Sequence, residues 1–104
     1  MSAYAVYGLV AGGDRVVYAG FTAEPGRRLV QHNAGAVRST ATGRPYRMIV
    51  LRWVGSREAA RRSEKYFKSG FGRKQLQRLP LHEFDQASDV VDISEKGYIH
   101  NPFA

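Results

Sequence analysis

The fold is decided by the stretch YAVYGLVAGGDRVVYAGF, which spans residues 4–21. Its two halves, 4–10 and 15–21, are rich in the β-branched and aromatic residues that favour strands. Gly12, Gly13 and Asp14 lie between them, and residues of these types favour tight turns. The stretch therefore predicts a β-hairpin.

A first helix is predicted directly after the hairpin, from about residue 24 to 34. Pro25 suits the first turn of a helix, and Glu24 is favourable at the positive N-terminus. Residues 35–45 mix Gly, Ser, Thr and Pro with arginine and show no periodicity, so a mobile loop is expected there.

A third strand and further helices are predicted in the next part of the chain. Residues 46–54 have the composition of a strand. Ser56 can cap a second helix, which carries small and apolar residues on one face and Arg and Lys on the other. Residues 73–79 predict one or two more helical turns, which Pro80 ends.

This order of elements, ββαβαα, predicts an α+β fold in which a small three-stranded antiparallel sheet is flanked by helices. We expect one domain over residues 1–80 and an acidic C-terminal extension over 81–104. The extension contains too many apolar residues for a purely solvated tail, so we expect it to pack on the body or on a partner.

The charge of the chain is strongly asymmetric. The net charge is +7, but it is unevenly distributed. Residues 1–80 hold fifteen basic and four acidic side chains, whereas residues 81–104 hold one basic and five acidic side chains. A basic body attracts polyanions, of which nucleic acid is the most available, although basic surface can also serve solubility alone. The acidic extension could shield the basic face.

Several classes of protein are disfavoured by the composition. The chain has no cysteine, no run of about 18 apolar residues and no secretory signal, which favours a cytoplasmic protein without disulfides or a membrane span. Three dispersed histidines do not make a zinc site. Gly12-Gly13 lacks the Gly-Lys-Ser/Thr of a phosphate-binding loop, so no nucleotide cofactor is expected. A monomer or weak dimer is expected.

Five side chains form a candidate constellation. Tyr7 and Tyr18 occupy corresponding places on the two predicted strands, Arg28 and His32 share one face of the first helix, and Glu64 lies on the second helix. Each has an ordinary alternative. The tyrosines can be packing residues, Arg28 and His32 can be surface groups, and Glu64 can be an i,i+4 partner of Lys68.

These residues, in this order, resemble the GIY-YIG nuclease family, in particular its small stand-alone bacterial members. The first motif reads Ala5-Val6-Tyr7, with alanine in place of glycine, and the second reads Tyr18-Ala19-Gly20. The stretches GRRLVQHN (26–33) and RSEKYFK (62–68) are similar to the family's first helix and metal-binding helix. A later asparagine used by several members has no convincing counterpart, and Asn101 is a remote candidate.

The resemblance implies a metal-dependent endonuclease with Tyr7, Tyr18, Arg28, His32 and Glu64 as catalytic residues. Glu64 would hold one Mg²⁺ or Mn²⁺, and the guanidinium of Arg28 would clamp the phosphate. Tyr7 would orient or deprotonate the attacking water with help from His32, while Tyr18 would position water or phosphate.

The family preference is for DNA, and a sequence-nonspecific or structure-selective enzyme is expected. The alternative is a non-catalytic nucleic-acid-binding accessory module on the same scaffold. Basic side chains around the site are candidates for contacts with the nucleic-acid backbone. The candidates are Arg27, Arg38, Arg44, Arg61, Lys65, Lys68, Arg73 and Lys74.

Overall fold

A computed structural model of the chain describes residues 3–12 and 15–103. Gly13 and Asp14 of the predicted turn lie outside the described residues. The elements in chain order are β1 (Tyr4–Val10), β2 (Val16–Thr22), α1 (Pro25–Asn33), the 3-10 helix η1 (Arg38–Thr40), β3 (Arg47–Val54), α2 (Arg57–Phe67), α3 (Gly70–Gln77), the 3-10 helix η2 (Leu81–Glu83) and β4 (Val90–Asp92). None of the helices in the described part of the chain has the length and apolar character needed to cross a bilayer.

The fold is α+β, as predicted, but its sheet has four strands rather than three. The strand order is β2-β1-β3-β4. Strands β2, β1 and β3 form the predicted antiparallel unit, and β4 pairs parallel to β3. The fourth strand was not predicted because it is only three residues long, which is too short to show a periodicity.

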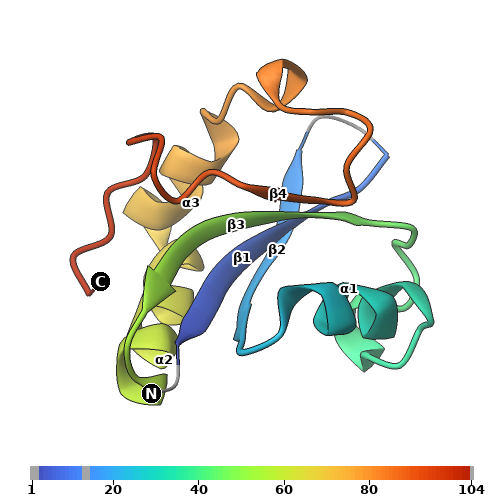
Figure 1. The fold of residues 1–104 in the computed structure, drawn as a ribbon, viewed down its shortest axis with the longest axis horizontal. Helices are drawn as coiled ribbons and strands as arrows, with labels where there is room; N and C mark the ends of the chain where they lie inside the picture. Colours follow the sequence, from blue (N-terminus) through green and yellow to red (C-terminus); the bar gives the residue numbers. More distant parts are fainter. Residues whose placement is uncertain (1–2, 13–14, 104) are drawn as a thin grey trace.

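Helices cover both faces of the sheet (Figure 1). On the α1 face, Leu29 packs with Tyr7, Leu9 and Met48 in one apolar cluster. On the other face, residues of α2 and α3 pack against a larger cluster that includes Ile49 and Leu51 of β3. The hairpin therefore contributes alternate side chains to two separate cores, and Tyr7 belongs to the α1 side.

The helix ends differ in part from the prediction. Ser56 caps α2 as expected, since its side chain accepts a hydrogen bond of 3.1 Å from the amide of Ala59. Helix α3 begins at Gly70, three residues earlier than predicted. The glycines there weaken the sequence signal for a helix. A Cβ at Gly72 would clash with the Tyr66 carbonyl oxygen, so only glycine permits this close contact between α2 and α3.

The loop 35–45 has more structure than its sequence indicates. It contains η1, and Thr40 at the end of this short helix is only 2% exposed. The hydroxyl of Tyr46 donates a 2.8 Å hydrogen bond to the Thr40 carbonyl oxygen. The Asn33 side chain accepts from the Tyr46 amide and donates to its carbonyl oxygen. These contacts attach the loop to α1 and β3.

The acidic extension packs on the body. Besides forming β4, it places Ile93 in the larger core at 2% exposure. Trp53 on β3 donates a hydrogen bond of 2.9 Å to Asp92, and Asn101 near the end donates one of 2.8 Å to Ser63 on α2. The C-terminal segment consequently lies beside α2 and α3 (Figure 1).

The extension is expected to contribute to stability through Ile93. Ile93→Ala removes a side chain that is almost fully buried, and it should lower the free energy of unfolding by about 2–5 kcal/mol in urea denaturation. Glu95→Ala, at an exposed position of the same segment, is the matched control and should change stability little. Equal stability of the two variants would show that this segment does not belong to the cooperative core.

Candidate active site

Four of the five candidate catalytic side chains line one pocket of about 540 Å³. They are Tyr7 from β1, Tyr18 from β2, Arg28 from α1 and Glu64 from α2. His32, the fifth, lies behind Tyr7 and is fully buried. The structure thus brings together groups that are up to 57 positions apart in the sequence, from Tyr7 to Glu64.

The hairpin register explains how the Tyr7 ring fits. Tyr7 pairs with Gly20 across the two strands, and Tyr18 pairs with Leu9, so both phenols lie on the α1 face. A Cβ at Gly20 would lie 2.7 Å from the Tyr7 hydroxyl oxygen and 2.8 Å from the ring carbon that bears it. Glycine at position 20 is therefore required for the Tyr7 ring to pass across β2.

The Tyr7 hydroxyl and His32 form a buried hydrogen bond. The oxygen lies 2.7 Å from His32 Nε2, and His32 Nδ1 lies 2.7 Å from Thr40 Oγ1. Thr40 has a single hydroxyl hydrogen, which it donates to the Val37 carbonyl oxygen. This contact favours the tautomer in which His32 Nδ1–H donates to Thr40. This leaves Nε2 as the acceptor for the Tyr7 hydroxyl.

Burial determines the protonation state of this pair. It raises the pKa of Tyr7 to about 12, an effect that the nearby guanidinium of Arg28 partly offsets. It also lowers the pKa of His32 from 6.5 to about 4, and the positive charge of Arg28 adds to this lowering. At neutral pH, Tyr7 is thus a protonated donor and His32 a neutral acceptor.

The two neighbouring arginines of α1 occupy different environments. Arg27 is exposed and forms an ion pair of 3.4 Å with Glu24. Arg28 is half-buried and donates a hydrogen bond of 3.0 Å to Gln31. Both line the pocket, but only Arg28 is close enough to affect the pKa values of Tyr7 and His32.

Glu64 is a suitable ligand for a hydrated divalent cation. Its side chain is 25% exposed, and its carboxylate lies 3.6 Å from the ammonium of Lys68. The carboxylate therefore already faces a positively charged group. In the described residues, no three His, Cys, Asp or Glu side chains gather into a metal cage. A single carboxylate in an open pocket fits Mg²⁺ or Mn²⁺, because Mg²⁺ usually keeps several waters and takes one or two carboxylates.

The predicted nucleic-acid contacts are spread over the surface. Arg27 lines the active-site pocket, and Lys68 and Arg73 line a second pocket beside it. The other five side chains are exposed and line neither pocket. They are Arg38, Arg44, Arg61, Lys65 and Lys74.

Sequence reasoning missed three residues that belong to the site. Arg57 lines the active-site pocket and lies over the Phe21 ring at 5.6 Å. Its position seven residues before Glu64 places both on one face of α2, so helical spacing could have found it. Gln31 accepts a hydrogen bond from Arg28. The two residues are three positions apart on α1, so helical spacing could have identified Gln31 as well. Thr40 lies in an aperiodic loop, where no sequence signal indicates its contact with His32.

Asn101 and the acidic extension lie away from the pocket. The Asn101 side chain donates a hydrogen bond to Ser63, a fully buried residue of α2. No residue of the described part of the extension, 81–103, lines the pocket. The extension therefore does not cover the pocket in this arrangement of the chain, because β4 attaches it to the opposite edge of the sheet from β2.

The neutral state of His32 predicts a pH dependence of stability. The pKa of His32 is 6.5 in the unfolded chain and about 4 in the folded chain. Its contribution to stability is therefore complete above about pH 6.5 and is lost as the pH falls toward 4, by on the order of 3 kcal/mol. Urea denaturation of wild type and His32→Gln across this range measures the difference. Parallel pH profiles would show that His32 is not buried in its neutral form.

Thr40 is expected to hold His32 in one tautomer. Thr40→Val removes the acceptor of Nδ1–H, so both tautomers should become populated and the Tyr7 hydroxyl should lose its fixed acceptor. Thr40→Ser retains a hydroxyl and is the control. Nitrogen-15 chemical shifts of the His32 ring report the tautomer directly, and a spectrum of Thr40→Val that matches wild type would contradict this role.

Comparison with known proteins agrees with the geometry. The family profile described as GIY-YIG catalytic domain matches residues 3–77, which include all five candidate catalytic residues. The comparisons with curated proteins and with solved structures each gave no significant match. The family match covers well over half of the chain and implies nuclease-type activity. The chain therefore belongs to the GIY-YIG family.

Proposed function

We propose that the protein is a divalent-metal-dependent endonuclease that hydrolyses phosphodiester bonds in DNA. Its family membership supports nuclease-type activity and nucleic-acid binding. The observation that carries the proposal is the convergence of Tyr7, Tyr18, Arg28 and Glu64, from four different elements, on one open pocket. This donor set matches what phosphodiester hydrolysis needs, namely a held water, a clamped phosphate and a cation site.

Arg28 is the phosphate clamp in this mechanism. Its guanidinium can donate two parallel hydrogen bonds to phosphoryl oxygens, and the Gln31 contact restricts its orientation. Arg27 and Arg57 line the same pocket and add positive charge around the phosphate. The pocket thereby favours the negative charge that builds up on the phosphoryl oxygens in the transition state.

Glu64 is the residue that would hold Mg²⁺ or Mn²⁺. When bound, such an ion supplies charge neutralisation at the phosphoryl oxygens and lowers the pKa of water. The Glu64 carboxylate stays accessible beside Lys68, because both side chains are partly exposed and their charged atoms lie 3.6 Å apart. Exchange of the ammonium for a divalent ion costs little, since exposed ion pairs are worth about 0–1 kcal/mol.

Tyr7 and His32 transfer the proton of the attacking water. Tyr7 alone is a poor base, because its pKa is about 12 and the hydroxyl is protonated at neutral pH. The hydroxyl can accept the water's proton as it passes its own to His32 Nε2, 2.7 Å away. A phosphate on Arg28 offsets the guanidinium charge that disfavours protonated His32, so substrate binding promotes this transfer. Tyr18 positions water or phosphate.

The substrate is bound mainly through its backbone. The body of the protein carries most of the positive charge, and twelve of the sixteen basic residues of the chain are Arg, which favours bidentate phosphate contacts. We assign these contacts to the eight basic side chains named above, with Arg27, Lys68 and Arg73 nearest to the pockets. Contacts of this kind position the strand without reading its sequence.

Glu64→Ala and Arg28→Ala should each reduce Mg²⁺-dependent cleavage of labelled DNA by at least about 10²-fold, because each removes a group that acts on the transition state. Glu58→Ala and Arg78→Ala remove an exposed acid and an exposed base elsewhere on α2 and after α3, and they should cleave like wild type. The substrates are single-stranded, duplex and branched DNA, together with RNA, with and without Mg²⁺.

Two results would contradict the proposal in different ways. Cleavage retained by Glu64→Ala, in protein free of contaminating nuclease, would reject the assigned roles. Salt-sensitive binding without cleavage in either Mg²⁺ or Mn²⁺ would identify the protein as a non-catalytic nucleic-acid-binding module instead.

A further inference from the structure

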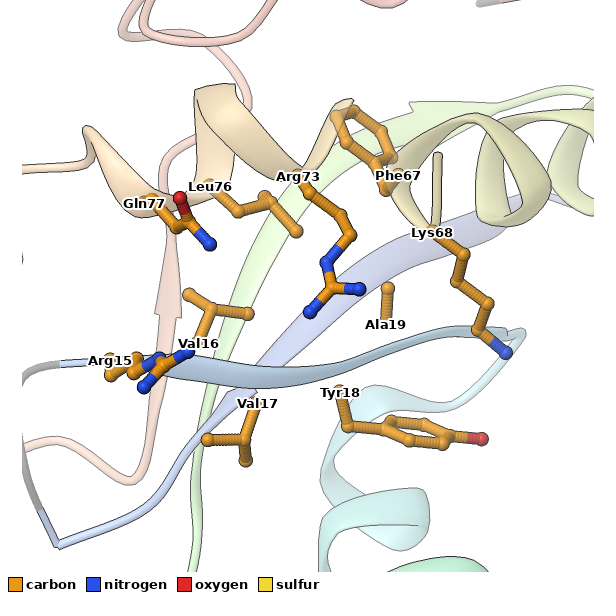
Figure 2. A pocket seen from close by; sticks show the side chains of 10 residues that line it. All are labelled: Arg15, Val16, Val17, Tyr18, Ala19, Phe67, Lys68, Arg73, Leu76 and Gln77. Carbon is orange, nitrogen blue, oxygen red and sulfur yellow. The ribbon is translucent and has the colours of Figure 1, made fainter. Parts of the chain in front are cut away.

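A second pocket lies beside the active site, between the β2 edge and the ends of α2 and α3 (Figure 2). It has a volume of about 310 Å³, which is within the range of small-molecule sites. Its floor is apolar and consists of Val16 and Ala19 from β2 together with Phe67 and Leu76 from the helices. An apolar floor of this kind is not needed to bind phosphate alone.

The rim of this pocket is positively charged. Arg15, Lys68 and Arg73 line it, and no acidic residue among the described ones does. In Figure 2, Arg73 extends from α3 toward β2, with Gln77 on one side and Lys68 on the other. The combination of an apolar floor and a cationic rim is complementary to a nucleotide, which has an apolar base face and an anionic phosphate.

The second pocket adjoins the active-site pocket. Tyr18 lines both. Lys68 lies between them, since its ammonium is 3.6 Å from the Glu64 carboxylate and 5.2 Å from the centre of the Tyr18 ring. A strand whose phosphate lies at Arg28 and Glu64 can therefore place its neighbouring nucleotide in the second pocket.

Ala19 is the residue that keeps the pocket open. It occupies the middle of the motif Tyr18-Ala19-Gly20, where the family name itself spells isoleucine. The Ala19 side chain lines the pocket, so a larger residue there would extend into the space.

We propose that this pocket binds the base of an unpaired nucleotide next to the scissile phosphate. The proposal rests on the proposed function, and it makes single-stranded or branched DNA the preferred substrate. A base inside a duplex is stacked and paired, and it can enter such a pocket only if it is unstacked. The apolar floor would contact the base, the Gln77 amide can donate to or accept from its edge, and Arg15 and Arg73 would hold the flanking phosphates.

The test compares binding of two oligonucleotides of equal length in EDTA, at one fixed salt concentration. One is a thymidine oligonucleotide and the other has the same backbone with every base removed. Wild type should bind the thymidine chain about tenfold more tightly, as expected for contacts with a base. Ala19→Ile should fill the pocket and bring the two affinities within about twofold, while its affinity for duplex DNA stays as in wild type.

A pair of arginine variants gives a second measurement that does not depend on how Ala19→Ile folds. Arg73→Ala removes a pocket charge, and Arg78→Ala removes the same charge from an exposed position at the end of the same helix. Arg73→Ala should weaken binding of the thymidine oligonucleotide several-fold more than Arg78→Ala does.

Equal binding of the two oligonucleotides by wild type would overturn the proposal, and so would equal effects of the two arginine variants. A thymidine preference that persists in folded Ala19→Ile would overturn it as well. Because binding is measured without metal, these outcomes are independent of catalysis. A protein that shows the thymidine preference but never cleaves would retain this pocket and lose the nuclease assignment.

Discussion

The hydrogen bond between the Tyr7 hydroxyl and His32 Nε2 is the contact on which the rest of the site depends. It joins β1, one of the two central strands of the sheet, to helix α1, and both side chains are buried. An unpaired hydroxyl or imidazole in that place would carry a penalty of about 1–3 kcal/mol, so both partners need fixed positions. Gly20 makes room for the phenol on one side, and Thr40 holds the imidazole on the other. The aperiodic loop after α1 therefore helps to hold His32 against the Tyr7 hydroxyl.

The position of the proposed cation site depends on a different part of the fold. Helix α2 presents Glu64 to the pocket, while the neighbouring residue Ser63 accepts a hydrogen bond from Asn101 of the C-terminal segment. Arg62 lies 5.8 Å from the centre of the Phe103 ring and adds a further contact. The acidic extension thus supports the helix that carries the carboxylate. Its negative charge lies away from the pocket, which leaves the positive potential of the body available to a polyanion.

Within the pocket, the electrostatic effects of Arg28 depend on whether a substrate is present. Burial lowers the pKa of His32 and keeps that imidazole neutral, and without phosphate the charge of Arg28 adds to this lowering. A bound phosphate would neutralise the guanidinium, so the same group that binds the substrate would also control the proton acceptor behind Tyr7. Lys68 has a similar dual position, because it pairs with Glu64 and borders the second pocket. In the proposed mechanism, binding and chemistry would be coupled through charge.

The sequence by itself determined the antiparallel unit of the sheet, the helices α1 and α2, and the five side chains of the candidate site, because each depends on local patterns. A β-branched and aromatic composition, a capping Ser56 and the i,i+4 spacing of Arg28 and His32 are properties of short segments. Only the tertiary structure decided the fourth strand, the contact between Thr40 and His32, and the pocket that Ala19 leaves open. These features join residues that lie far apart in the chain or in aperiodic segments, and packing alone specifies which of them meet.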